Sequence, residues 1–93
     1  MAARPLIFRQ HAIKRMFERS ITVDEIETTL AEGSVIEDYP TDTPYPSALW
    51  LGFPDSRPLH VVVADSAAER IIITVYEPNP ALWESDWKTR SKT

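Results

Sequence analysis

Two histidines are the side chains of this chain best suited to transferring a proton near neutral pH, and arginines accompany the first of them. His11 precedes Arg15 and Arg19 at intervals of four residues, which places all three along one face of a helix. The second histidine, His60, lies in a run of β-branched residues that is typical of a strand. The sequence therefore offers one histidine on a basic helix face and one in a predicted sheet.

The chemistry that these side-chain types could perform is the cleavage of RNA without a metal ion. A base must remove the proton of the 2′-hydroxyl, an acid must protonate the leaving 5′-oxygen, and cations must stabilise the charge that develops on the phosphate. Histidine suits the first two roles because its reference pKa is about 6.5. Arginine suits the third because its planar guanidinium matches phosphate oxygens. We therefore predict His11 and His60 as acid and base, with Arg15 and Arg19 as phosphate ligands.

Two helices are predicted in the first third of the chain. The first covers Phe8–Arg19, where the apolar residues follow a helical spacing and form one stripe. The members of this stripe are Ala12, Ile13, Met16 and Phe17. The second covers Val23–Ala31, because Thr22 and Glu25 have the spacing of a capping box. Gly33 is expected to end this helix in the left-handed conformation.

The rest of the chain predicts an antiparallel sheet of about four strands. The expected strands are Val35–Tyr39, Ser47–Phe53, Leu59–Ala64 and Arg70–Tyr76. The short connector between the last two makes them an antiparallel hairpin. Asn79 and Pro80 then predict a final helical turn, with the asparagine as its N-cap. The fold class is thus α+β, with two N-terminal helices packed on a curled antiparallel sheet and a short C-terminal helical turn.

Alternation along the last hairpin gathers the polar residues on one of its faces. If Ala64 pairs with Arg70, then His60 pairs with Thr74, and Tyr76 lies one diagonal step away. The core face then consists of Leu59, Val61, Val63, Ile71, Ile73 and Val75. The other face consists of His60, Val62, Ile72, Thr74 and Tyr76. This mixture suits either the floor of a cleft or a partly exposed outer surface.

Composition and length restrict the remaining possibilities. With 93 residues, the chain is long enough for one domain, expected over residues 1–93. Cysteine is absent, so no disulfide and no thiolate metal site can form. The histidines and carboxylates lack a recognisable metal-ligand spacing, and the two glycines form no phosphate-binding loop. We expect neither a metal nor another cofactor.

The charge distribution is more informative than the net charge of −4. An acidic total argues against nucleic-acid binding by the surface as a whole, because phosphate contacts need positive charge. Basic residues nevertheless gather in the first segment, at Arg4, Arg9, Lys14, Arg15 and Arg19, and can create a local positive field. The N-terminus lacks the apolar stretch of a signal peptide, and no run approaches a membrane span of about 20 residues. We expect a cytoplasmic protein with no membrane partner.

Residues 11–21 carry the most specific motif, and they read HAIKRMFERSI. This segment resembles the H-A-x-x-R-M-x-E-R-x-I opening of a small bacterial family, the domain of unknown function numbered 4258. Residues 58–62 and 73–78 also resemble the sheet of that family, and the resemblance extends from about Phe8 to Trp83. It implies a fold similar to RelE-like and MqsR-like toxins, which are small metal-independent ribonucleases with helices on an antiparallel sheet.

The resemblance also implies a biological role and a set of site residues. Members of the family are similar to the toxin half of a toxin–antitoxin pair, so the implied partners are an RNA substrate and an antitoxin protein. The implied active site consists of His11, Arg15 and Arg19 from the helix with His60, Thr74 and Tyr76 from the sheet.

Each candidate residue also has a plainer structural interpretation. His11 near a helix start can be a solvent-facing or capping residue, and the arginines can form an ordinary ion-pair face with Glu18. His60 can be a structural histidine, and the two hydroxyl residues are also good strand formers. The alternative function is a non-catalytic protein-binding module, or a degenerate toxin that acts through a partner protein.

Overall fold

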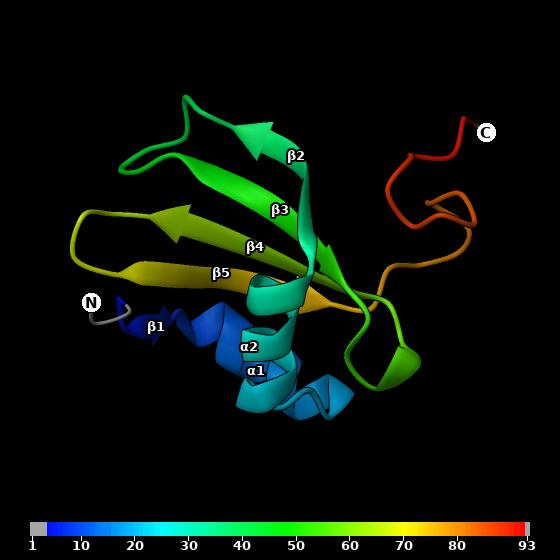
Figure 1. The fold of residues 1–93 in the computed structure, drawn as a ribbon, viewed down its shortest axis with the longest axis horizontal. Helices are drawn as coiled ribbons and strands as arrows, with labels where there is room; N and C mark the ends of the chain where they lie inside the picture. Colours follow the sequence, from blue (N-terminus) through cyan, green and yellow to red (C-terminus); the bar gives the residue numbers. More distant parts are fainter. Residues whose placement is uncertain (1–3, 93) are drawn as a thin grey trace.

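A five-stranded mixed sheet that does not close on itself carries two helices on one face (Figure 1). The computed structural model describes residues 4–92. The helices are α1 (Gln10–Arg19) and α2 (Val23–Glu32), and a short 3-10 helix, η1 (Pro54–Ser56), joins β3 to β4. The strands are β1 (Leu6–Phe8), β2 (Ser34–Tyr39), β3 (Ser47–Gly52), β4 (Leu59–Asp65) and β5 (Arg70–Tyr76), and they lie in the order β1-β5-β4-β3-β2. The predicted α+β class is confirmed.

The short strand β1 was not predicted, and it makes the sheet mixed instead of antiparallel. It pairs in parallel with β5, with Ile7 opposite Ile71. The Arg9 backbone N–H continues this contact by donating to the Ile72 carbonyl at 3.0 Å. Because the backbone before Gln10 belongs to the sheet, α1 begins two residues later than the predicted helix. Only three residues form β1, too few for a periodic signal.

The start of α2 confirms the predicted capping box, whereas its end does not follow the prediction. The Thr22 hydroxyl accepts from the Glu25 N–H at 3.1 Å, and the Glu25 carboxylate accepts from the Thr22 N–H at 2.9 Å. Gly33 has φ −84°, so the expected left-handed conformation is wrong. A Cβ on Gly33 would lie 2.3 Å from the carbonyl oxygen of Leu51 on β3. Glycine is needed there because two backbone segments approach closely.

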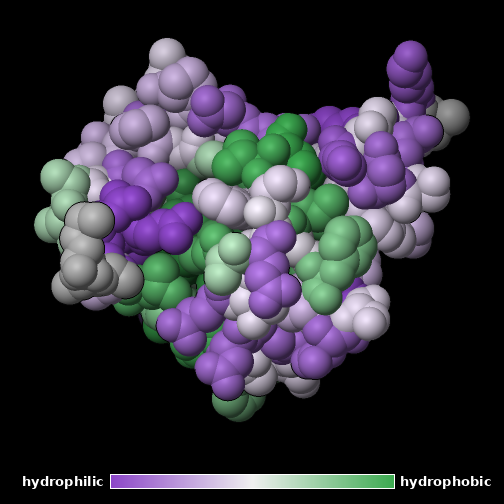
Figure 2. All heavy atoms as spheres, viewed as in Figure 1, coloured by the Kyte–Doolittle hydropathy of each residue, from purple (hydrophilic) through white to green (hydrophobic). Residues whose placement is uncertain are grey.

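The core lies between the helices and the sheet and contains only half of the predicted α1 stripe. Its buried members are Ala12, Ile21, Ile26, Leu59, Val61, Val63, Ile72 and Val75. Met16 packs against this cluster, but Ile13 is 54% exposed and Phe17 is 90% exposed. The expectation that these two residues face the core is wrong. Helix α1 packs mainly against β5, and only the side of the helix that carries Ala12 and Met16 faces the core. Figure 2 shows that hydrophobic surface also appears in patches among hydrophilic side chains on the face drawn in Figure 1.

The register of the β4–β5 hairpin differs from the prediction because of a β-bulge. Asp65 pairs with Arg70 and Val63 with Ile72, and beyond the bulge the pairing is Val62 with Thr74 and His60 with Tyr76. The irregularity leaves Ile73 without a partner and moves Ile72 to the core face, where it is fully buried. Beyond this extra residue, the side chains of β5 again alternate between the two sheet faces as predicted. His60 therefore still shares a face with Thr74 and Tyr76. Tyr76, not Thr74, is the direct neighbour of His60.

Residues 77–92 fold back at one end of the sheet, where they contact His60 of β4 and Glu37 of β2 (Figure 1). Asn79 begins a single hydrogen-bonded turn, in which its carbonyl accepts from the N–H groups of Leu82 and Trp83. Its side-chain oxygen accepts from the Ala81 N–H at 2.9 Å, as predicted for the N-cap of a short turn. Trp83 is buried and packs edge-on against His60, with 4.6 Å between ring centroids. Within residues 4–92, neither helix has the length and apolar character needed to cross a bilayer.

Candidate active site

A groove between α1, the end of β5 and the C-terminal segment contains five of the six predicted site residues. Its volume is about 440 Å³. The predicted residues that line it are His11, Arg15, Arg19, Thr74 and Tyr76. The C-terminal segment completes the wall with Leu82, Trp83 and Arg90, among others. The basic helix face and the hydroxyl-bearing strand therefore share one cavity.

The spacing of α1 explains why its cations reach this groove together. Residues four apart lie on one helical face, and α1 packs along β5, so this face borders the strand that carries Thr74 and Tyr76. The guanidinium of Arg15 lies 3.9 Å from the Glu18 carboxylate, and both side chains are more than 40% exposed. Such an exposed pair contributes less than about 1 kcal/mol. Arg19 makes no ion pair within the described part of the chain, so both guanidinium groups are available to a ligand.

His60 does not line the groove but lies behind Tyr76, fully buried. Its Nε2 is 2.7 Å from the Trp87 carbonyl oxygen, and its Nδ1 is 3.3 Å from the Tyr76 hydroxyl. A carbonyl can only accept, so Nε2 carries the proton, and the neutral ring presents Nδ1 as an acceptor. The Tyr76 hydroxyl therefore donates to Nδ1. This arrangement excludes direct contact between His60 and a ligand in the groove and makes Tyr76 the exposed end of the pair.

Burial determines the protonation states of this pair. Loss of hydration lowers the pKa of His60, although the Trp87 carbonyl and the Glu37 carboxylate act in the opposite direction. Burial also raises the pKa of Tyr76. At neutral pH the groove therefore presents a protonated phenol whose hydrogen bond ends on a neutral imidazole.

Arg90 is a groove residue that no pattern in the sequence indicates. It forms two hydrogen bonds of 2.9 and 3.0 Å with the Glu37 carboxylate of β2, which also accepts from the Tyr39 hydroxyl. Its guanidinium lies 4.7 Å from the centroid of the Trp83 ring. Hydrogen bonds from Arg90 are the main reason that the pKa of Glu37 is lowered. Because 53 positions separate Arg90 from Glu37, no local pattern could have indicated this ion pair.

The comparisons with known proteins identify one family. Residues 8–77 match the family described as Domain of unknown function (DUF4258). The chain belongs to the DUF4258 family. No curated protein and no solved structure gave a match.

The DUF4258 match contains all six predicted site residues and ends just after β5. Leu82, Trp83 and Arg90 lie beyond residue 77, so part of the groove wall comes from outside the matched region. The ring of Trp83 and the carbonyl of Trp87 both contact His60. The C-terminal segment of this DUF4258 protein thus holds His60 in place.

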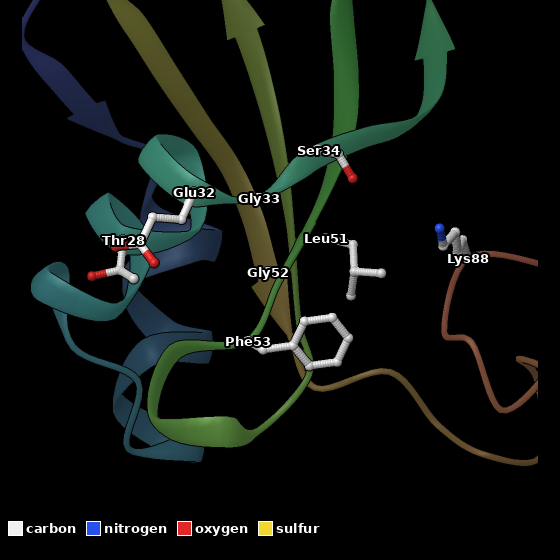
Figure 3. A pocket seen from close by; sticks show the side chains of 8 residues that line it. All are labelled: Thr28, Glu32, Gly33, Ser34, Leu51, Gly52, Phe53 and Lys88. Carbon is white, nitrogen blue, oxygen red and sulfur yellow. The ribbon is translucent and has the colours of Figure 1, made fainter.

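A second hollow of about 320 Å³ lies at the C-terminal end of β3, at the end of the sheet where Leu51 pairs with His60 (Figure 3). The side chains of Leu51 and Phe53 point into it, and Lys88 of the C-terminal segment faces them from the other side. Glu32 lies on the α2 side, away from Lys88. The lining of this hollow contains no histidine. Its two ionisable side chains, Glu32 and Lys88, lie apart and do not form a pair for proton transfer. Within residues 4–92, no three His, Asp or Glu side chains are grouped as metal ligands.

Proposed function

We propose that this DUF4258 protein is a metal-independent endoribonuclease that acts in the cytoplasm as the toxin of a toxin–antitoxin pair. The observation that carries the proposal is the shared groove, in which His11, Arg15 and Arg19 face Thr74 and Tyr76. This is the combination of a proton-transfer group, phosphate ligands and hydroxyls that RNA cleavage by its own 2′-hydroxyl requires. An antitoxin is the corresponding protein partner.

The phosphate ligands in this proposal are the two groove arginines of α1. Arg15 and Arg19 present positive charge along one side of the groove, and an RNA phosphate placed between α1 and β5 meets both guanidinium groups. The charge on the phosphate oxygens increases as the 2′-oxygen attacks, so these contacts strengthen in the transition state. Thr74 supplies a further hydroxyl that orients the phosphate.

The proton transfers are assigned from the hydrogen bonds of the His60–Tyr76 pair. The Tyr76 hydroxyl donates to His60 Nδ1, which leaves its oxygen lone pairs free to accept the proton of the 2′-hydroxyl. The phenol then passes its own proton to Nδ1, and the nearby Glu37 carboxylate favours the resulting imidazolium. His11 donates a proton to the 5′-oxygen. The bond from the 2′-oxygen to phosphorus forms, the bond to the 5′-oxygen breaks, and the products are a 2′,3′-cyclic phosphate and a 5′-hydroxyl.

The proposal is tested by incubating labelled single-stranded RNA with micromolar protein, with and without EDTA. We expect cleavage under both conditions. His11→Ala should reduce the rate by roughly 10²–10⁴-fold, the usual contribution of a general acid. Lys14→Ala is the matched control, because Lys14 is an exposed cation of α1 that does not line the groove, and its rate should stay near that of the wild type. Intact RNA under both conditions, or equal rates for the two variants, would reject the proposal.

A non-catalytic binding module is the second candidate, and the exposure of Ile13 and Phe17 on α1 favours it. If the protein acts only through a partner, replacing His11, Arg15 and Tyr76 together should leave its effect on cells unchanged. The measurement is growth inhibition after induced expression of wild-type and triple-variant protein. Growth inhibition that disappears with the triple change would exclude this second function.

A further inference from the structure

A third hollow adjoins the groove at His11. Its volume is about 370 Å³, and it lies between the start of α1 and the loop of residues 40–46 that joins β2 to β3 (Figure 1). Arg9 and His11 line it from the helix side, and Asp42 and Tyr45 line it from the loop. We call this cavity the Tyr45 hollow. It combines a cation, a carboxylate and an aromatic ring beside the candidate active site.

The bulge in β5 brings the Tyr45 hollow next to the groove. Ile73, the extra residue of the bulge, borders the hollow, and the following residue, Thr74, borders the groove. His11 borders both cavities. β-Bulges redirect side chains in this way and are frequent beside active sites. A ligand chain that occupies the groove can therefore continue past His11 into the Tyr45 hollow.

We propose that the Tyr45 hollow binds an unpaired base next to the cleaved phosphate and prefers a base with an exocyclic amino group, such as cytosine. This inference rests on the proposed ribonuclease function, because the occupant is a neighbouring nucleotide of the same RNA strand. It adds a sequence preference, which the cleavage chemistry itself does not require.

Tyr45 provides the surface on which the base stacks. Its side chain is 40% exposed, and no other aromatic ring of residues 4–92 stacks against it. Proteins recognise single-stranded RNA by stacking its bases on such rings. Every base has a flat face, so stacking gives affinity without selecting a base.

Asp42 is the residue that selects the base. The hydroxyl of Ser47, which is buried, donates to Oδ2 of Asp42 and fixes the orientation of the carboxylate. The other carboxylate oxygen has no hydrogen-bond partner within residues 4–92. A carboxylate accepts from the amino group at position 4 of cytosine, whereas uracil has a carbonyl oxygen, also an acceptor, at that position. The hollow therefore distinguishes two pyrimidines of equal size.

Arg9 provides positive charge for the phosphate of the same nucleotide. Its exposed side chain neither caps α1 nor forms an ion pair within residues 4–92. An RNA strand that extends from the groove into the hollow thus meets Arg15 in the first and Arg9 in the second. An acidic peptide would also be attracted by these cations, but it would bring its carboxylates against Asp42. The ring and the carboxylate together favour a nucleotide over a peptide.

The test uses tetramers of deoxycytidine and of deoxyuridine, which lack the attacking 2′-hydroxyl, so binding is measured without cleavage. Affinity is determined by titration followed by amide chemical shifts, which also locate the site. We expect shifts in residues 41–46 and at the start of α1, with roughly tenfold tighter binding of the deoxycytidine tetramer. Asp42→Asn should remove this preference, because the amide can donate to uracil and can still accept from Ser47.

Two substitutions of Tyr45 separate stacking from a structural role. Tyr45→Ala should weaken binding of both tetramers about tenfold, the usual effect of removing one stacked ring. Tyr45→Phe keeps the ring and should bind as the wild type does. Phe53→Ala is the matched control, because Phe53 is an exposed aromatic residue that lines neither the hollow nor the groove. It should also bind as the wild type does.

Three results would overturn the proposal. These are no binding of either tetramer, equal binding by wild type and Tyr45→Ala, and equal affinity of the wild type for the two tetramers. Shifts in the hollow caused by tetraglutamate instead of the tetramers would assign it to an acidic protein segment and would also reject a base. Cleavage of ordinary RNA by a protein that gives any of these results would leave the ribonuclease function standing without this subsite. Tetramer binding that requires Tyr45 in a protein that leaves RNA intact would retain the nucleotide site and reject the ribonuclease function.

Discussion

Replacing His60 by glutamine should flatten the dependence of stability on pH just below neutrality. Burial lowers the pKa of His60 in the folded protein, whereas the unfolded chain has the ordinary value of about 6.5. Below that value the unfolded state binds a proton that the folded state does not. The free energy of unfolding of the wild type must therefore decrease as the pH falls through about 6.5, until the pH reaches the lower, folded-state pKa.

The size of this effect follows from the linkage of one proton. The limiting slope is about 1.36 kcal/mol per pH unit. If folded His60 stays neutral, integration from about pH 6.5 to 5.5 gives a loss of about 1 kcal/mol. In a domain of this size that corresponds to a decrease in Tm of roughly 4–8 °C. Glu25 and Glu37 also have lowered pKa values, but their contributions are lost only below about pH 4.3, so they do not overlap with this window.

The assay is urea unfolding of wild type, His60→Gln and His11→Gln at several pH values, followed by far-UV circular dichroism. The chain has only two histidines, so His11→Gln is a complete control. It should keep the pH-dependent loss of stability, and His60→Gln should lack it, even if that variant is less stable overall. A slope that survives in His60→Gln, or disappears in His11→Gln, would refute the assignment of His60 as the buried neutral histidine.

Three further substitutions test the fold and the groove. Arg57 connects η1 to α2 through a partly buried ion pair with Glu25 at 2.8 Å. Arg57→Ala should therefore lower the free energy of unfolding by about 2 kcal/mol. Thermal denaturation measures this loss, and an unchanged Tm would contradict the structural role of Arg57. Gly33→Ala places a Cβ 2.3 Å from the Leu51 carbonyl oxygen, so it should lower the free energy of unfolding by about 2 kcal/mol in a urea titration. A variant as stable as the wild type would show that β3 can move away from this Cβ. Arg19→Ala should weaken RNA binding and reduce the salt dependence of log K by about one phosphate contact, and an unaltered salt slope would remove Arg19 from the groove contacts.

Local signals in the sequence predicted most of the elements. The capping box at Thr22 and Glu25 defined the start of α2, and the β-branched runs located β4 and β5. These features depend on neighbours within a few positions, which is the range over which sequence patterns are informative. The groove side of α1 was also predictable, because the spacing of His11, Arg15 and Arg19 is set by the helix itself.

Features that depend on distant contacts were not predictable. The bulge at Ile73 exchanges the faces of its neighbours in β5, and only the pairing with β4 reveals it. A helical spacing identifies Ile13 and Phe17 as apolar but cannot show that α1 turns them away from the core. The contact between Arg90 and Glu37 likewise depends on how the C-terminal segment folds back over the sheet. The sequence could therefore identify the groove residues of α1 but not the residues that complete the wall.

The most direct test of the proposed chemistry uses an RNA in which one cleaved position carries a 2′-deoxy sugar. We expect cleavage to be lost at that position and to persist at the others, and the products to end in a 2′,3′-cyclic phosphate and a 5′-hydroxyl. Cleavage that continues at the 2′-deoxy position, with a 5′-phosphate on the product, would show that water and not the 2′-hydroxyl attacks, and would contradict the roles assigned to Tyr76, His60 and His11.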